Sequence, residues 1–343
     1  MTFDALFFAT RDVIVSGMKD IRWIPVALVV ILVSSGKALA WAQEGHAAIA
    51  ALAEDLISPH TRAKVQELLN QGGDKDLVSI ASWADLVLIA AHDEGPLRGN
   101  QEALAFSRKF PNSGMWHFVN LPLGTTSYEQ ITQFDAPDDV IHAISRCLDV
   151  LESPLTRPED FTKVQALRLL VHFVGDIHQP LHCGTGFYTF SESGAPQLVI
   201  EPEHAFGKPN DRGGNLLYYG ASPIQQLHAL WDKVLVEEAD NSIDYRVLAD
   251  FLKKSYLPKE IARTPGDYHE WAKIWAIDSV RIAALAYRGI NFGTADLADD
   301  GHLLRIEISL PPGYQEINKA RAALQLARAG VHLAQLLDSL NWQ

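Results

Sequence analysis

The sequence is poor in cysteine and has no excess of positive charge. Its two cysteines, Cys147 and Cys183, exclude a disulfide framework and leave either one bridge or two free buried thiols. The formal net charge of −13 excludes a generally basic surface as the basis for binding a polyanion. If the substrate is a nucleic acid, positive charge must therefore come from another source.

Internal repeats and low-complexity tracts are also absent from the sequence, which excludes a repeat architecture. The chain has 343 residues, of which 48% are hydrophobic. It is thus long enough and apolar enough to bury a large core as a globular protein.

An apolar run near the N-terminus is too short to span a bilayer. Arg22 precedes WIPVALVVILVSS, which has about the length of the apolar part of a secretory signal, and Ala38-Leu39-Ala40 fits a signal-peptidase site. We therefore expect residues 1–40 to be a signal peptide that is cleaved after Ala40, and the protein to be periplasmic or secreted. An uncleaved membrane anchor is the alternative.

The segment before this run is unusual for a signal peptide, because it carries Asp4 and Asp12. Met18 begins a conventional signal by itself, so we expect translation to start there. Cleavage would leave residues 41–343 as a single domain without a stable membrane anchor. Because residues 1–40 contain four basic and three acidic residues, the mature chain would carry one more negative charge.

From Trp41 onward, apolar residues recur mostly at helical spacing. FTKVQALRLLVHFVGDIH predicts a long apolar helix that stops before Pro180, and YHEWAKIWAIDSVRIAALAY predicts an amphipathic one. The stretch 184–214 is rich in Pro, Gly and Ser and is the one long segment expected to have turn and short-strand character. We interpret it as a hairpin or loop insertion in an all-α, single-domain bundle of helices.

Histidine and aspartate recur inside the apolar segments. His172 and Asp176 are four residues apart in LLVHFVGDIHQPLH, so they project from one face of the most apolar helix. A hydrogen bond between the two would satisfy an isolated pair, whereas burying such groups unpaired costs about 1–3 kcal/mol each. The pair is not isolated, because other His and Asp residues also lie in apolar context: His46, Asp85, His117, His182, His228 and Asp232.

Five histidines and three aspartates in such surroundings are hard to satisfy by hydrogen bonds alone. Sets of imidazole and carboxylate groups favour zinc. A catalytic zinc takes about three protein ligands, so the number of candidates predicts more than one ion.

Six motifs, in this order, resemble the type-one nuclease family: WAQEGH, SWAD, WHFVN, HFVGDIHQPLH, GGN and LHALWD. The resemblance covers residues 41–343. Members of that family are secreted, single-strand-specific nucleases and 3′-nucleotidases with three zinc ions in an all-α fold. The resemblance therefore implies a helical bundle around a trinuclear zinc cleft, whose ions would supply the missing positive charge.

By resemblance, nine residues would hold three Zn²⁺ ions as cofactors. One ion would be bound by Asp85, His117, His172 and Asp176. A second ion would be bound by His182, His228 and Asp232. The third would be bound by the α-amine and carbonyl of Trp41, by His46, and by the other oxygen of Asp176. Because an α-amine coordinates a metal only when it is free and neutral, cleavage after Ala40 would complete this third site.

The activity that the resemblance implies is hydrolysis of single-stranded DNA and RNA to 5′-phosphate products, and of 3′-nucleotides, by a monomer. A zinc-bound hydroxide would attack phosphorus, and Asp85 would accept its proton as well as bind metal. Phe118 would stack on a base, while Asn120 and Asn215 would hydrogen-bond its edge. Core packing is the alternative role for Phe118, and a turn position is the alternative for Asn215.

Two positions depart from the family pattern. Three residues after Asp85, members carry a basic residue, but this chain has Leu88; Arg98 in the following loop is the candidate replacement. Asn120 stands where fungal and plant members usually have aspartate.

Two other functions remain as alternatives. One is a phosphodiesterase like zinc phospholipase C, which would have a longer gap before its first histidine and Glu in place of Asp232. The other is a non-catalytic, zinc-stabilised, secreted helical protein, which the absence of a basic residue at position 88 would favour.

Overall fold

The computed structural model describes residues 41–342 apart from positions 135, 156, 222–223, 238–243 and 299. The expected signal peptide, residues 1–40, and the expected start at Met18 lie outside the described residues. From Trp41 onward the chain belongs to one compact unit. Among the helices of this described part, none is long and apolar enough to cross a bilayer.

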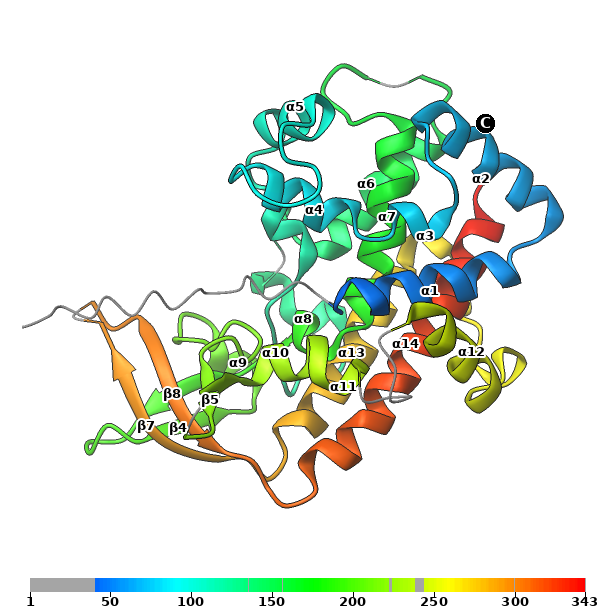
Figure 1. The fold of residues 1–343 in the computed structure, drawn as a ribbon. Coiled ribbons are helices and arrows are strands. Elements are labelled where there is room, and N and C mark those ends of the chain that lie inside the picture. The colour runs from blue at the N-terminus through cyan, green and yellow to red at the C-terminus, as the bar shows by residue number, and fades with distance from the viewer. Residues whose placement is uncertain are drawn as a thin grey trace, which may run out of the picture. The chain divides into compact units, whose positions relative to one another are not determined.

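Helices make up most of the described fold (Figure 1), which confirms the prediction of a mostly helical single domain. The α-helices are α1 (Gln43–Leu56), α2 (Pro59–Gly72), α3 (Leu77–Ile80), α4 (Trp83–Ala90), α5 (Gln101–Lys109), α6 (Val140–Glu152), α7 (Lys163–His178), α8 (Pro180–Cys183), α9 (Pro202–Ala205), α10 (Leu227–Ala229), α11 (Leu235–Glu237), α12 (Tyr245–Ser255), α13 (Trp271–Tyr287) and α14 (Tyr314–Ser339). Short 3-10 helices are η1 (Ser113–His117), η2 (Tyr128–Phe134), η4 (Pro258–Glu260) and η5 (Tyr268–Glu270), and a π-helical turn, η3 (Leu230–Val234), joins α10 to α11.

Helix α7 is the buried axis of the helical part. Thr162 and Gln165 cap its first turn reciprocally, each side chain accepting a hydrogen bond from the other's backbone N–H. Every residue from position 166 to 178 is buried, because α1, α6, α13 and α14 pack around the helix. Both cysteines are free and buried within this part of the fold. The helix stops before Pro180, as predicted.

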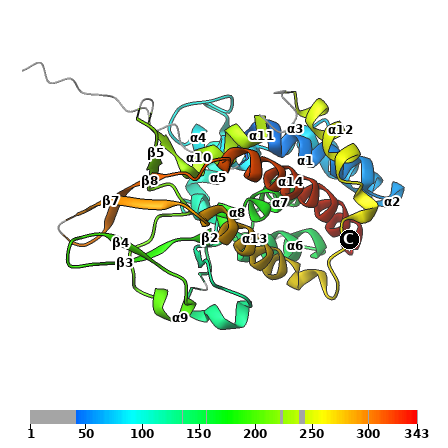
Figure 2. The same ribbon diagram turned by 90° about the horizontal axis from the view of Figure 1, so that it is seen from below.

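The strands form small sheets beside the helices. β1 (Leu121–Pro122) runs parallel to β2 (Gly184–Thr185), and β3 (Phe187–Phe190) pairs antiparallel with β4 (Pro196–Val199). A four-stranded sheet has the order β6 (Gln225–Gln226), β5 (Leu217–Tyr219), β8 (Leu303–Ser309) and β7 (Asn291–Leu297). Figure 2 shows β3, β4, β5, β7 and β8 at one end of the described fold, away from α2 and α12, whereas β2 lies beside α13.

The β3–β4 hairpin confirms the predicted insertion near 184–214. The expectation that this segment alone has strand character over a long stretch is wrong, because β7 and β8 form a second hairpin. Its signal was present in LLRIEIS, where Ile306 and Ile308 are buried and Glu307 between them is exposed. Gly301 in the connecting turn has the left-handed backbone, with φ of 83°, that glycine adopts without strain.

The two ends of the insertion are tied together by Asp211. Its backbone N–H donates to Gly186 O at 3.0 Å, and its Oδ1 accepts from Gly186 N–H at 3.2 Å. The hydroxyls of Tyr188 and Tyr287 also donate to this carboxylate. The insertion therefore leaves and rejoins the fold at one fixed neck.

Gly184 packs directly against α13. A Cβ added at this position would lie 2.3 Å from the Cβ of Ala283. Gly184 also faces Leu121 in the β1–β2 pair. The absence of a side chain therefore lets the segments that follow His117 and His182 meet against one helix.

Replacing Gly184 with alanine is expected to lower the free energy of unfolding by about 1–3 kcal/mol, because the added methyl group must displace α13 or β2. Gly114→Ala is the matched control, since the nearest atom to its added Cβ would be 3.7 Å away, in Leu88. Urea unfolding followed by circular dichroism measures both variants. Equal stability of the two would contradict the close packing at Gly184.

Candidate metal centre

Two side chains of ligand type project from α7 into the protein interior. His172 and Asp176 lie one turn apart, with His172 Nε2 3.2 Å from Asp176 Oδ2. Both side chains are fully buried. The prediction that they share one face of the helix is confirmed, and their polar atoms need partners inside the protein or a bound ion.

Asp85 of α4 and His117 of η1 meet His172 to form a first group of candidate ligands. Asp85 Oδ1 is 3.6 Å from both His117 Nδ1 and His172 Nε2, and these two nitrogens are 3.2 Å apart. Ligand atoms bound about 2 Å from a tetrahedral zinc stand roughly 3.3 Å from one another. The three atoms therefore have the mutual spacing that a zinc ion requires.

A second group consists of His182 of α8, His228 of α10 and Asp232 of η3. His228 Nε2 is 3.2 Å from Asp232 Oδ2, and the rings of His182 and His228 stack with centroids 5.1 Å apart. The predicted pair four residues apart thus faces one way, although a π-helical turn replaces the regular helix expected there. Single π-helical turns are frequent at functional sites.

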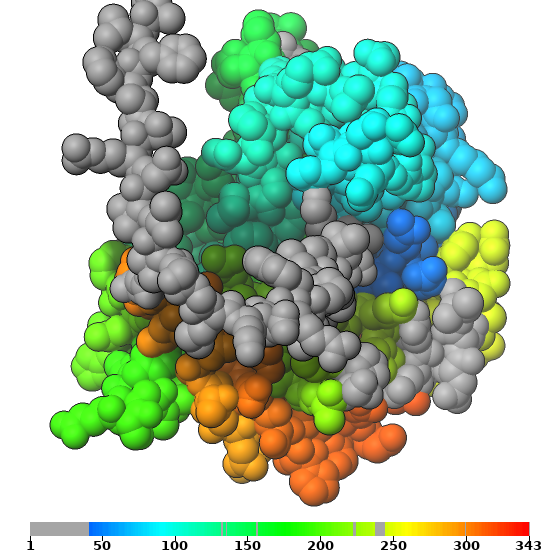
Figure 3. Space-filling view, turned by 60° about the vertical axis from the view of Figure 1, so that its left-hand side comes forward, coloured from blue at the N-terminus to red at the C-terminus, as the bar shows by residue number. Residues whose placement is uncertain are grey.

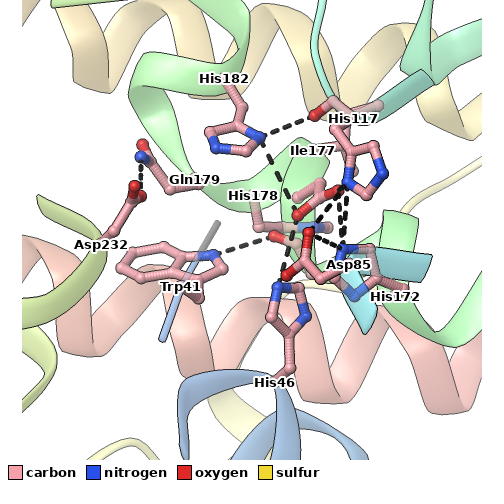
Figure 4. Close-up of polar contacts among 12 residues, drawn as sticks. Trp41, His46, Asp85, His117, His172, Ile177, His178, Gln179, His182 and Asp232 are labelled. Atoms are coloured by element: carbon pink, nitrogen blue, oxygen red, sulfur yellow. Dashed lines mark hydrogen bonds and ion pairs between the residues drawn. The ribbon is translucent and has the colours of Figure 1, made fainter. Parts of the chain in front are cut away.

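Asp176 lies between the first group and His46. Its Oδ2 is 3.0 Å from His117 Nδ1, whereas its Oδ1 is 3.4 Å from His46 Nε2 and 3.9 Å from His182 Nδ1. His46 of α1 forms a third group with His172 and Asp176, and its ring stacks on His172 at 4.0 Å. Figure 4 shows His46, His117 and His172 converging from separate elements. A carboxylate with its oxygens turned to two groups is able to bridge two ions.

The first described residues lie against the same cluster. Trp41 is fully buried, and its Nε1–H donates to Gly175 O of α7 at 2.9 Å (Figure 4). Ala42 N–H donates to Asp232 O at 2.7 Å. A Cβ at Gly175 would lie 2.6 Å from His46 Nδ1, so glycine is needed there for His46 to reach Asp176.

Backbone carbonyls orient three of the histidines. Nδ1 of His172 lies 2.8 Å from Ala81 O, that of His182 lies 2.7 Å from His117 O, and that of His228 lies 2.6 Å from Gly213 O. Each Nδ1–H therefore donates to a carbonyl, so Nε2 is the nitrogen left to face the cluster and to bind a metal. Gly213 was not predicted in this role, although it lies inside the GGN motif.

Several buried polar atoms of the cluster have no hydrogen-bond partner: His46 Nδ1, His46 Nε2, Asp176 Oδ1, His182 Nε2 and Asp232 Oδ2. Buried polar atoms without partners are rare, because each costs about 1–3 kcal/mol. These atoms belong to imidazole and carboxylate groups, which are zinc ligands. The cluster therefore fits divalent metal ions in its atom types as well as in its spacing.

The buried carboxylates of the cluster also need a positive charge beside them. Burial raises the pKa of Asp232 to about 7 and lowers the pKa of His182 to about 3. Burial also opposes protonation of His172, but the carboxylates of Asp176 and Asp85 raise its pKa to about 9. The pKa of Asp176 lies well below its usual range, because the lowering effect of His172 and His117 exceeds the raising effect of burial. Protons thus balance the carboxylates in the protein alone, and a metal ion would replace them.

Two of the three residues expected to contact a base closely follow the candidate ligand His117 in the chain. Phe118 is half-buried and directly follows His117. The Asn120 carboxamide is 2.9 Å from Thr185 Oγ1. Asn215 Nδ2 donates to Arg212 O at 3.0 Å, so this side chain stabilises the turn that was considered as its alternative role.

Arg98, the candidate replacement for the basic residue missing at Leu88, is engaged within its own loop. Its Nε and Nη2 donate to the two carboxylate oxygens of Asp93 at 3.0 and 2.8 Å. The Arg98 side chain is 66% exposed. In this arrangement its guanidinium binds Asp93 rather than a residue of the cluster.

The family model for S1/P1 Nuclease matches residues 41–341 of the chain. The chain belongs to the S1/P1 nuclease family. The resemblance seen in the six sequence motifs is thereby confirmed, and the match begins at Trp41.

Named relatives agree with this assignment. Endonuclease 4 of Arabidopsis thaliana is 26% identical over 349 residues, which cover 93% of this chain and 95% of the relative. Nuclease S1 of Aspergillus oryzae is 23% identical over 321 residues, or 88% and 92% of the two chains. Nuclease P1 of Penicillium citrinum is 27% identical over 149 residues, or 41% and 47%. This member of the S1/P1 family is a nuclease, and nucleic acids are its substrates.

Zinc binding to the metal-free S1/P1 nuclease is expected to weaken as the pH falls from about 8 to about 6. Asp232 takes up a proton across this range and His172 carries one throughout, and both protons must leave before metal binds. Competition with a chromophoric chelator measures the affinity, and calorimetry in several buffers counts the released protons. A zinc affinity independent of pH in this range would contradict the assignment of these residues as ligands.

Proposed function

We propose that this protein is a zinc-dependent endonuclease that hydrolyses single-stranded DNA and RNA to 5′-phosphate products and also acts on 3′-nucleotides. The observation that carries the proposal is the presence of three buried His/Asp groups, two of which share His172, in a member of a nuclease family. Such a centre would concentrate positive charge at one point, as a protein of net charge −13 requires for a polyanionic substrate.

Three Zn²⁺ ions are the proposed cofactors. The first would be held by Asp85, His117, His172 and Asp176. The second would be held by His182, His228 and Asp232. The third would be held by the main-chain nitrogen and carbonyl of Trp41, by His46 and by Asp176. When bound, zinc lowers the pKa of water toward ~7 and withdraws charge from a phosphate group.

The exposure of the ligands indicates the side from which substrate approaches. The side chains of Asp85, His117, His182 and His228 are between 5 and 8% exposed, whereas those of His46, His172 and Asp176 are at most 1% exposed. Asp85, His117, His182 and His228 therefore border solvent, whereas His46, His172 and Asp176 lie deeper in the protein. Figure 3 shows a recess with atoms of α4 and α5 (cyan) on one side and atoms of the strand segments (green and orange) on the other.

Asp85 is the proposed proton acceptor of the reaction. Its carboxylate lies on the solvent side of the first group, where it can take a proton from the attacking water as well as bind metal. The leaving 3′-oxygen would lie beside His182, His228 and Asp232, which gives products with 5′-phosphates.

Single-strand preference would follow from the need for an unstacked base. Phe118 would stack on the base, and Asn120 and Asn215 would hydrogen-bond its edge. The half-buried position of Phe118 next to His117 supports this role. Stacking of this kind contributes about 1–3 kcal/mol and tolerates any base. We propose that the protein acts on these substrates as a monomer.

The mature enzyme is proposed to begin at Trp41, after removal of residues 1–40, and to be periplasmic or secreted without a membrane anchor. The family match starts at Trp41, which supports this boundary. The contact between Ala42 N–H and Asp232 O supports it further, because it holds the segment that would carry the free α-amine beside the ligands.

The two alternative functions predict results that differ from those of a nuclease. Activity like that of a zinc phospholipase C is disfavoured, because the matching family and the named relatives are nucleases. A non-catalytic, zinc-stabilised protein would release no nucleotides at all, so the experiments below distinguish it from the proposed enzyme.

Asp85→Ala in the zinc-loaded mature protein is expected to lower the release of acid-soluble nucleotides from denatured DNA by about 100- to 10,000-fold, because it removes the proton acceptor and a metal ligand. Asp55→Ala is the matched control, since Asp55 is an exposed aspartate of α1 that pairs with Lys253. A chelator should abolish the activity of the unmodified protein. Full activity of the Asp85→Ala variant would refute the proposed mechanism.

A mature protein with one extra residue before Trp41 is expected to bind one zinc ion fewer than a protein that begins at Trp41. The extra residue converts the α-amine of Trp41 to an amide nitrogen, which is a poor metal donor. Metal analysis after dialysis measures the difference, and the nuclease assay should fall with it. Equal zinc content in the two proteins would exclude the α-amine as a ligand.

A further inference from the structure

We infer that Gln179 is a positioning residue that sets the orientation of Asp232 and fixes the second ligand group to α7. The inference rests on the metal-binding role proposed above. Gln179 is fully buried in the turn between α7 and α8 and faces Asp232 (Figure 4).

Hydrogen bonds determine which way the Gln179 carboxamide points. Its Oε1 accepts from the backbone N–H of Leu181 at 2.6 Å, and its Nε2 lies 2.6 Å from Asp232 Oδ1. An NH₂ group cannot accept a hydrogen bond from the N–H of Leu181. The oxygen of Gln179 must therefore face Leu181, and the NH₂ group must donate to Asp232.

This hydrogen bond gives the two carboxylate oxygens of Asp232 different roles. Oδ1 accepts from Gln179, whereas Oδ2 is buried without a hydrogen-bond partner and lies 3.2 Å from His228 Nε2. One oxygen is thus held by the protein and the other is presented to the ligand group. Outer partners that orient a ligand in this way typically change metal affinity 10- to 100-fold when removed.

The backbone of Gln179 connects the same group to the rest of the centre. Its N–H donates to Asp176 O at 2.9 Å, and its carbonyl accepts from His182 N–H at 3.0 Å. One residue therefore contacts Asp176, which is shared between groups, and two members of the second group. These contacts fix the separation of the ligand groups.

A purely structural role for Gln179 would be to cap α8 through its bond to Leu181. That role depends on the carboxamide oxygen alone and does not require the hydrogen bond from the NH₂ group to Asp232. The test must therefore show that Gln179 acts through Asp232.

The test uses Gln179→Met in the mature protein that begins at Trp41, with zinc occupancy titrated against a competing chelator. His228→Ala identifies the binding step of the second group, because it removes a ligand of that step. We expect Gln179→Met to weaken this step by about 10- to 100-fold and to leave the other steps unchanged. Gln325→Met is the matched control, since Gln325 is a buried glutamine that donates to His178 O at 2.9 Å and contacts no candidate ligand in the described contacts.

The Asp232→Ala background separates positioning from capping. If Gln179 acts through Asp232, Gln179→Met has no further effect on zinc affinity in that background. Equal losses with and without Asp232, or unchanged affinity in Gln179→Met alone, would overturn the inference.

Two measurements keep these outcomes distinct. Thermal unfolding without metal reports whether each variant folds, and Gln179→Asn, whose carboxamide is too short to reach both Leu181 and Asp232, replaces a Met variant that does not fold. If the unmodified protein shows no zinc-binding step that His228→Ala removes, the proposed function itself fails.

Discussion

The buried carboxylate of Asp176 is the interaction on which the rest of the centre depends. It is fully buried on α7, so its charge has to be balanced by groups that other elements bring. One of its oxygens faces His117 and the other faces His46. The α1 and η1 segments therefore meet α7 at this carboxylate as well as through apolar packing. Folding and assembly of the site are thus one process.

Orientation of the ligands is mostly a backbone function in this protein. Ala81, His117 and Gly213 hold three imidazole rings through their carbonyl oxygens, which have few conformational choices once the chain has folded. Asp232 differs, because a side chain orients it. The second group therefore depends on one buried carboxamide for the direction of its carboxylate, and it also has two histidines on the solvent side.

The sequence predicted those parts of the site that are local. His172 and Asp176 were found because four residues make about one helical turn, whereas the grouping of distant ligands was implied only by the resemblance to the nuclease family. The hairpin of β7 and β8 was missed, although LLRIEIS alternates as a strand does, because helical segments surround it. The π-helical turn at Asp232 has no pattern of its own, since it shares the apolar spacing of an α-helix. The role of Gly213 could not be predicted, because it depends on a loop meeting His228 from 15 residues away.

The neck formed by Gly186 and Asp211 separates the chemistry from the segment that it encloses. The segment between these residues starts and finishes at the same hydrogen-bonded point, and Tyr188 and Phe187 near its start pack against the rest of the fold. Its exposed tip, residues 192–194, is free of such packing, so the length of the tip affects stability mainly through a slowly varying loop entropy. The tip of this hairpin can therefore be lengthened, or can carry a small inserted module, while His182 and His228 on either side of the segment keep their places.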